Sequence, residues 1–185
     1  MYTLTFSGSG DAVKRGGYYT VRNEDQDHQQ LIGVNSPAWR DWATKAQAWQ
    51  DAKKVGPAPE KIDPLAVNQD ALRDGKSYLT STFFGGSSAS EVEMTITGEG
   101  AEPRTLEVEH TQPHQGEALN KGWEFTDPIT ATHNLSNSGN VAQASPHLWR
   151  AVLPKDLTLG TYQAEVKAVD NFGQTNTQQV TFTVC

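Results

Sequence analysis

The sequence predicts a mainly β fold, an antiparallel sandwich preceded by a small β-meander and one amphipathic α-helix. Two observations predict the sandwich: apolar residues alternate with polar ones in most segments from residue 76 onward, and Gly- and Ser-rich turns separate these segments. Several short alternating strands at fairly regular spacing are typical of an immunoglobulin-like β-sandwich. A chain of 185 residues can bury a core without disulfides, and Cys185 is the only cysteine.

The first 36 residues are expected to form the small β-meander. Tyr2, Leu4 and Phe6 recur with period two, as in a half-buried strand. Residues 18–21 are rich in strand formers, and residues 30–34 have the composition of a third short strand. Polar turns separate the three segments.

An amphipathic helix is expected after the meander. Ser36 suits the N-cap and Pro37 the first helical position, while Gly56 and Pro57 end the helix and begin a stiff connector that reaches about residue 69. The apolar residues that share one helical face are Trp39, Trp42, Ala43, Ala46 and Trp49. Such a stripe is usually core; the alternative is a platform on which sugars stack.

The sandwich is expected to occupy the rest of the chain. Its strands are expected at residues 78–84, 92–96, 106–109, 148–153, 162–168 and 180–184. Residues 110–145 are rich in Asn, Gly, Ser, Thr and His and are expected to form mainly long loops. We therefore expect two units: residues 1–70, with the meander, helix and connector packed on the following domain, and residues 71–185, the sandwich.

Composition excludes several classes of partner. The chain has 15 Lys and Arg against 22 Asp and Glu, which gives a net charge of −7, and its basic residues are not clustered. Nucleic acid and anionic membrane surfaces are therefore not expected partners. The apolar runs are too short for insertion into a membrane, and the first residues lack the pattern of a signal peptide.

Candidate metal and catalytic residues have a structural explanation in each case. His110 and His114 have the spacing of two ligands on a helix, but Pro113 argues against a helix there, which favours a solvated loop. Asp127 and Asp170 lie in turn-like sequences and are expected to be turn residues rather than calcium ligands. Four glutamates alternate with apolar residues and fit a solvated strand face better than a glycosidase carboxylate pair; they are Glu91, Glu93, Glu107 and Glu109.

Three motifs resemble the C-terminal domain of bacterial calcineurin-like metallophosphoesterases. The most specific is Ser-Pro-His-Leu-Trp at residues 145–149, and Phe-Gly-Gly-Ser-Ser at 84–88 and Asp-Asn-Phe-Gly at 170–173 accompany it. The resemblance extends from about residue 2 to residue 184 and is weakest over the Trp-bearing helix and its Pro-rich connector.

This resemblance implies an accessory domain and not the enzyme. In such proteins an upstream domain holds two metals with Asp, His and Asn motifs, and no such motif is present here: Gly10-Asp11 continues as Ala-Val-Lys. We therefore expect a non-catalytic chain with no catalytic residues, no metal and no cofactor. Its partner is expected to be the upstream catalytic domain of the same polypeptide, and the parent is expected to be periplasmic or secreted.

Three residues are candidates for contacts with a ligand or with another domain. They are Trp123, which lies in the loop-rich region, and His147 and Trp149 of the Ser-Pro-His-Leu-Trp motif. An alternative function is a carbohydrate- or cell-surface-binding β-sandwich module, which five tryptophans suggest. A free-standing enzyme with a Ser/His site in residues 110–145 has no support from motif spacing.

Overall fold

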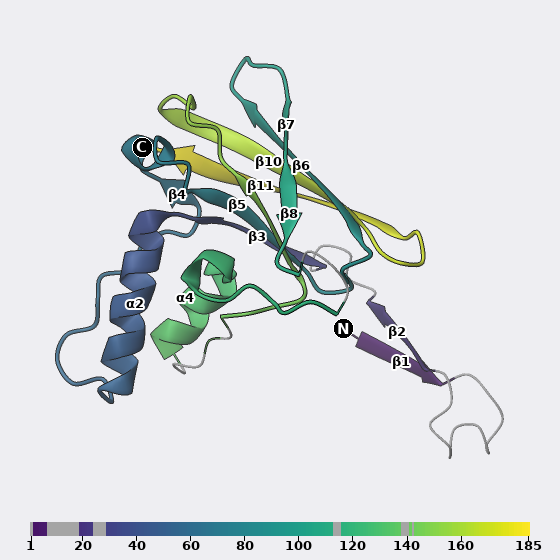
Figure 1. Cartoon of the computed structure of the whole chain (residues 1–185), viewed down its shortest axis with the longest axis horizontal. Coiled ribbons are helices and arrows are strands. Elements are labelled where there is room, and N and C mark those ends of the chain that lie inside the picture. Colours follow the sequence, from purple (N-terminus) through teal and green to yellow (C-terminus); the bar gives the residue numbers. More distant parts are fainter. Residues whose placement is uncertain (1, 7–18, 24–28, 113–115, 138–140, 142) are drawn as a thin grey trace.

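The computed structural model describes residues 2–6, 19–23, 29–112, 116–137, 141 and 143–185. It is a mixed α/β structure with two larger β-sheets arranged as in a sandwich (Figure 1). The five-stranded sheet has the order β4 (Ala66–Val67), β11 (Thr175–Val184), β10 (Gly160–Val169), β6 (Glu91–Gly98), β7 (Arg104–Leu106). The four-stranded sheet has the order β3 (Gln30–Asn35), β5 (Tyr78–Phe83), β9 (Leu148–Val152), β8 (Val108–His110). Neighbouring strands are antiparallel except β4 and β11, which are parallel.

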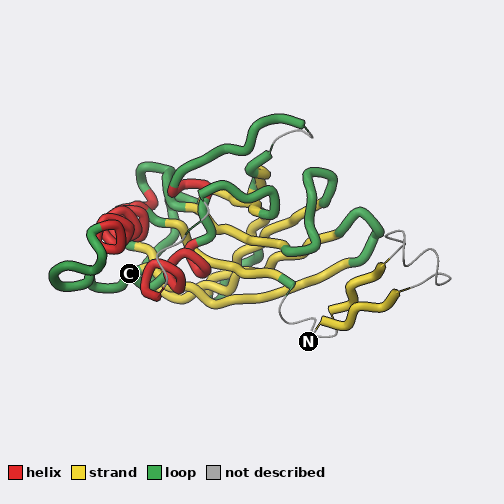
Figure 2. Tube along the Cα trace, turned by 90° about the horizontal axis from the view of Figure 1, so that it is seen from below, coloured by secondary structure: helices red, strands yellow, loops and turns green. Residues whose placement is uncertain are grey.

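Helices form a third layer on the outer face of the four-stranded sheet. This helical layer consists of α2 (Pro37–Asp51), the 3₁₀ helix η2 (Trp123–Phe125) and α4 (Pro128–Asn137); a short helix, α3 (Gln69–Leu72), follows β4. Figures 1 and 2 place α2 and α4 side by side, toward the end of the molecule that carries the C-terminus. No described helix is long and apolar enough to cross a membrane.

The helix expected after the meander is confirmed together with its N-terminal cap. Ser36 Oγ accepts a hydrogen bond from Trp39 N–H, and Pro37 occupies the first turn. The helix ends at Asp51, before the expected stop at Gly56 and Pro57, because Lys53 and Lys54 adopt positive φ, a conformation that stops helical propagation.

The prediction of mainly long loops over residues 110–145 needs one correction, because this stretch also contains the helices η2 and α4. Asp127, expected to be a turn residue, caps α4 instead: its carboxylate accepts hydrogen bonds from Ile129 N–H and from the Thr130 hydroxyl. Ala131 and Leu135 then point from α4 into the core of the helical layer. Asp-Pro is a helix-start signal that a composition rich in Ser, Thr and Asn conceals.

The three-stranded meander is also corrected. β1 (Tyr2–Phe6) pairs with β2 (Tyr19–Asn23), but β3 pairs with β5, 43 or more residues later in the chain. Residues 7–18 and 24–28, which include the turns expected between these strands, lie outside the described residues. Residues 1–70 thus contribute one edge strand to each of the two larger sheets, β3 to the four-stranded sheet and β4 to the five-stranded sheet. Strands from both sides of residue 70 therefore build the sandwich.

One expected strand is divided between the sheets. The segment expected as one strand at 106–109 pairs through β7 with β6 in one sheet and through β8 with β9 in the other. The chain crosses between the sheets at Glu107, which is exposed. The remaining strands expected from alternation are confirmed as β5, β6, β9, β10 and β11.

The main core lies between the two sheets. Side chains from both inner faces fill it, among them Leu79, Met94, Trp149 and Phe182. All six residues of β5 are buried, because the helical layer covers the opposite face of this strand. Close packing at that face requires Gly33: a Cβ there would lie 2.8 Å from a side-chain carbon of Pro128.

Gln30 is a buried polar residue that joins the two sheets. Its Nε2 donates to Asn176 Oδ1 (2.7 Å) and to the Val166 carbonyl (3.3 Å) on the five-stranded sheet. Its Oε1 accepts from the Ser81 hydroxyl (2.9 Å) on the four-stranded sheet. Because a buried amide must be hydrogen-bonded, this bridge fixes the register of one sheet over the other.

Candidate functional site

Three segments that are far apart in the sequence meet at one end of the two sheets, which we call the loop end. They are residues 84–90 after β5, residues 145–147 before β9 and residues 170–174 between β10 and β11. Phe83 N–H donates to the His147 carbonyl (2.8 Å), and β6 begins opposite the last residue of β10. The three sequence motifs of the resemblance therefore lie together in the fold.

His147 and Trp149, two of the expected contact residues, hold the loop end together. His147 Nδ1 lies 2.8 Å from the Gly86 carbonyl oxygen. Trp149 is 3% exposed and lies beneath Gly86, where a Cβ would come within 2.4 Å of the indole. The same indole packs against Phe83 and stacks on His110, with 6.2 and 4.3 Å between ring centroids. His147 keeps a half-buried surface, whereas Trp149 supports the loop from within.

A second contact ties the β10–β11 turn to the loop after β5. Asp170 Oδ1 accepts hydrogen bonds from the backbone N–H groups of Phe172 and Gln174, each 2.8 Å long. Asp170 is thus a turn residue, as the sequence predicts. Ser87 Oγ donates to Asn171 Oδ1 (3.0 Å), so the two loops are directly linked.

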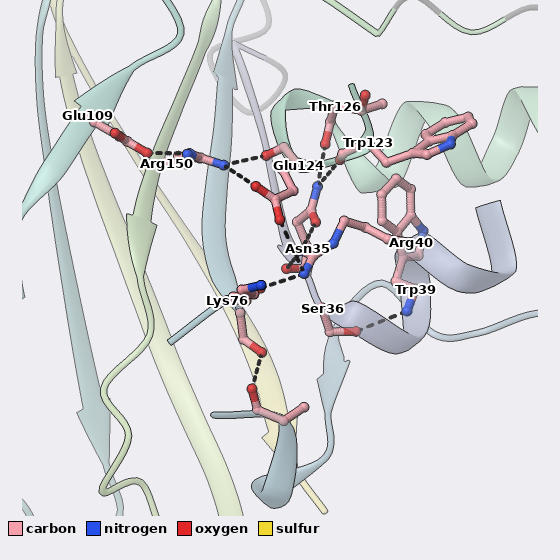
Figure 3. A network of polar contacts seen from close by, with 12 residues as sticks. Asn35, Ser36, Trp39, Arg40, Lys76, Glu109, Trp123, Glu124, Thr126 and Arg150 are labelled. Atoms are coloured by element: carbon pink, nitrogen blue, oxygen red, sulfur yellow. Dashed lines mark hydrogen bonds and ion pairs between the residues drawn. The ribbon is translucent and has the colours of Figure 1, made fainter. Parts of the chain in front are cut away.

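Trp123, the third expected contact residue, lies away from the loop end in the helical layer. Its half-buried ring meets Trp39 edge to face, with 6.2 Å between centroids, and its carbonyl accepts a hydrogen bond from Asn35 Nδ2 (2.7 Å; Figure 3). Trp39 and Trp42 are buried against Ala131 and Leu135 of α4. The core interpretation of the Trp stripe is confirmed for Trp39 and Trp42, and α2 packs on its own chain.

Arg150 is the centre of a polar network between the four-stranded sheet and the helical layer (Figure 3). Arg150 is 7% exposed, and its guanidinium carbon lies 4.1 Å from the ring centroid of Tyr78 and 3.8 Å from the ring centroid of Phe125. Nε donates to the Glu109 carboxylate, and Nη1 donates to the Glu124 carbonyl (2.9 Å). A cation between two rings with both edges paired is held in one orientation.

Arg40 extends this network to α2. Its Nη1 donates to Asn35 Oδ1 (2.8 Å) and its Nη2 to the Lys76 carbonyl (2.8 Å; Figure 3). Burial lowers the pKa of the Arg40 guanidinium from its ordinary value, and the Glu124 carboxylate, 4.0 Å away, opposes this shift. Two cations and two carboxylates balance in charge, so the network ties the helical layer to the sheet.

The other residues considered as metal ligands or catalytic groups make contacts within the fold or lie on its solvated surface. His110 does not lie in a solvated loop as expected: it is the half-buried last residue of β8, and its ring nitrogens lie 2.7 and 2.8 Å from the carbonyl oxygens of Gln112 and Pro146. Burial raises the pKa of the Asp127 carboxyl above its ordinary value, although its capping hydrogen bonds act in the opposite direction. Glu91, Glu93 and Glu107 are exposed, as expected for a solvated face.

Among the described residues, no three His, Cys, Asp or Glu side chains lie together as potential metal ligands. His114, the partner considered for His110, lies outside the described residues.

Sequence reasoning missed the residues that stand out in the structure. Arg150 and Arg40 belong to no sequence motif, and only the tertiary contacts in the structure show their partners. Phe84 and Phe172 are 46% and 89% exposed at the loop end. A sequence signal for Phe172 was present: it follows Asp-Asn and precedes Gly, which predicts a turn and therefore an aromatic side chain at an exposed tip.

The fold and these contacts define a two-sheet β domain with a helical layer, in which the polar side chains described above brace loops and helices. The chain belongs to the family described as the C terminal of calcineurin-like phosphoesterase, whose model matches residues 2–176. The resemblance inferred from the three motifs is thereby confirmed.

Comparisons with individual proteins add little to the family match. No curated protein matches the chain. PcoC, a methionine-rich copper resistance protein from Escherichia coli, aligns with 18% identity over 58% of this chain and 80% of that chain, with a TM-score of 0.32. A family 123 glycoside hydrolase from Clostridium perfringens aligns with 11% identity over 85% of this chain and 27% of that chain, with a TM-score of 0.29. Both scores are too low to bear on fold or activity.

Proposed function

We propose that this chain is a non-catalytic accessory domain that stabilises or orients the catalytic domain of a calcineurin-like phosphoesterase. The family match to a C-terminal domain supports this most directly, because such a domain accompanies a catalytic partner. The partner is the phosphoesterase domain that precedes it in the same polypeptide, and the chain itself needs no cofactor.

The use of the titratable side chains also favours a structural role. His147 binds a backbone carbonyl, Asp127 caps a helix and Asp170 closes a turn. Glu109 pairs with Arg150. Each of these groups thus has at least one intramolecular partner, which gives it a structural use within the fold.

We also propose that the sandwich has the immunoglobulin-like topology. When β3, β5, β6, β8, β9, β10 and β11 are lettered A to G in chain order, the sheets have the orders A-B-E-D and G-F-C. The additional strands β4 and β7 lie at the edges of the second sheet. Long-range amide–amide contacts in an NMR spectrum of the chain test this assignment; pairing of β5 with β6 in one sheet would contradict it.

The hydrolysis assay separates an accessory domain from an enzyme. The purified chain is incubated with Mn²⁺ and bis(p-nitrophenyl) phosphate beside a calcineurin-like phosphoesterase as positive control. We expect no turnover above the metal-only blank. Robust metal-dependent hydrolysis that survives further purification would refute the non-catalytic role.

A glycan titration addresses the carbohydrate-binding alternative. Tryptophan fluorescence is followed while oligosaccharides are added, and acrylamide quenching is measured in parallel. We expect no saturable shift, because Trp39, Trp42 and Trp149 are at most 4% exposed. The half-buried Trp49 and Trp123 also have intramolecular partners, the Gly56 carbonyl and the Trp39 ring. A saturable shift that is lost in Trp123→Phe would favour the binding module.

We further propose a periplasmic or secreted parent protein, which is supported by the sequence resemblance alone. Cell fractionation of the native organism with an antibody against this chain tests it, since recovery in the cytosolic fraction would contradict export.

A further inference from the structure

The loop end presents aromatic surface that the chain itself does not cover. Phe172 is 89% exposed at the tip of the β10–β11 turn, and Phe84 is 46% exposed directly after β5. The Phe residues of the core, Phe83 and Phe182, are at most 4% exposed. Aromatic side chains at rigid, exposed positions are typical anchors of protein interfaces.

The tip that carries Phe172 is held in one conformation. Two backbone hydrogen bonds to Asp170 Oδ1 close the turn, and Gly173 supplies the positive φ of 77° that the turn requires. A side chain presented by such a turn loses little backbone entropy on binding.

The two loops that carry these aromatic residues are hydrogen-bonded to each other. Ser87, three residues after Phe84, donates to Asn171, the residue before Phe172. Below this link, Gly86 lies directly on Trp149, so the loop after β5 is supported from the core. We call the surface formed by Phe84, Ser87, Asn171 and Phe172 the loop-end surface.

The polypeptide also approaches the sandwich at this end. Phe84 N–H donates to the Gln29 carbonyl (3.1 Å), and Gln30, the first residue of β3, is paired with Phe83. Figures 1 and 2 place the β1–β2 hairpin beyond the same end, away from the C-terminus. Under the proposed function the preceding domain is joined to the sandwich at this end, so its contact with the loop-end surface is intramolecular and gains from a high effective concentration.

We propose that the loop-end surface is the docking site for the phosphoesterase catalytic domain that precedes this chain, with the Phe172 ring in an apolar pocket of that domain. This proposal rests on the proposed function. It adds which surface makes the contact, and it explains why three family-like motifs converge at the end where the chain approaches.

The test uses the intact polypeptide with a specific protease site introduced directly ahead of residue 2. After cleavage, gel filtration shows whether the two halves stay together, and titration of the separated halves gives their Kd. The variants are Phe172→Ser and the double variant Phe84→Ser/Phe172→Ser. The matched control is Leu159→Ser, since Leu159 is 65% exposed next to Gly160 at the opposite end of the sheets.

We expect the wild-type halves and the Leu159→Ser halves to co-elute. Phe172→Ser should weaken binding by about 30-fold, as for an anchor residue, and the double variant should separate. Circular dichroism verifies folding. If Phe84→Ser unfolds the chain, Phe172→Ser and Phe172→Tyr carry the test, because an 89% exposed side chain contributes little to the fold.

Three results would overturn the docking site: wild-type halves that separate on cleavage, equal binding by Phe172→Ser and wild type, or a dimer of the chain alone that Phe172→Ser dissociates. A reading frame with no phosphoesterase domain ahead of this chain would overturn it as well. Hydrolysis of bis(p-nitrophenyl) phosphate by the chain alone would instead refute the non-catalytic role, so the two failures are distinguishable.

Discussion

Replacement of Arg150 by alanine should lower the free energy of unfolding strongly, whereas the same replacement of a surface arginine should not. The guanidinium lies between Tyr78 and Phe125, and each desolvated ring contact contributes on the order of 0.5–2 kcal/mol. The charged donor to the Glu124 carbonyl contributes about 1.5–3 kcal/mol. The Glu109 carboxylate adds about 0–1 kcal/mol, because its side chain is 57% exposed and is rehydrated when the pair is lost.

These contributions overlap, so we expect Arg150→Ala to lower the free energy of unfolding by about 3–5 kcal/mol. Arg150→Lys should lose about 2 kcal/mol, because lysine keeps the charge but neither the planar stack nor the second donor. Urea denaturation followed by tryptophan fluorescence and circular dichroism measures both. Arg104→Ala is the matched control, since Arg104 pairs with Asp156 in solvent and its loss should change little.

An Arg150→Ala protein as stable as Arg104→Ala would refute the reasoning, as would an Arg150→Lys protein with wild-type stability. The first result would mean that the stacked guanidinium contributes no net energy. The second would mean that charge alone, and not planar geometry, matters at this position.

Three further predictions concern the packing, the sheet bridge and the helix cap. Gly86→Ala should cost about 1–3 kcal/mol of unfolding free energy by overpacking against the buried Trp149 indole. Gly85→Ala should be nearly neutral, because its Cβ would lie 3.7 Å from its nearest neighbour. Urea titrations of the two variants measure the difference, and equal stabilities would contradict the prediction. Gln30→Ala should lose about 1–3 kcal/mol, because it unpairs buried groups on both sheets, and amide exchange should rise in β3 and β11; a loss under about 0.5 kcal/mol would count against the bridge. The raised pKa of Asp127 makes ionisation of this carboxyl costly in the folded state, so the wild type should lose stability relative to Asp127→Asn as the pH rises from the ordinary pKa near 3.8 through the raised pKa. Denaturation of both proteins from pH 3.5 to 7 measures this difference. A difference that does not change with pH, or that changes in the opposite direction, would refute the prediction.

Local signals in the sequence predicted the elements that depend on local chemistry. Ser36 and Pro37 placed the start of α2, and alternation placed β5, β6, β9, β10 and β11. The sequence did not predict α4, because only two of its ten residues after the first proline, Ala131 and Leu135, are buried and apolar. Two apolar positions do not define a helical period within a segment that is otherwise polar.

Partners of strands could not be predicted in the same way. Alternation shows that residues 104–110 are extended, but it does not show that the chain changes sheets at Glu107. Similarly, β3 resembles the third strand of a local meander, and its pairing with β5 is decided by burial beneath Pro128 and Ile129 of α4.

The site was predictable as a set of motifs but not as a surface. The sequence marked residues 84–88, 145–149 and 170–173 as family-like, and their convergence follows from hydrogen bonds across about 60 to 85 residues of chain. Arg150 carries no sequence signal, because its environment consists of rings and carboxylates from three other segments.

The accessory role is tested most directly by deleting residues 2–185 from the intact phosphoesterase polypeptide. Metal content, kcat/KM for bis(p-nitrophenyl) phosphate and thermal melting are compared with and without the domain. We predict that the truncated enzyme keeps two metals per catalytic domain and measurable turnover, but melts at a lower temperature. Loss of bound metal and of all turnover in a truncated protein that remains folded would show that this chain supplies part of the catalytic site, and would contradict the proposal.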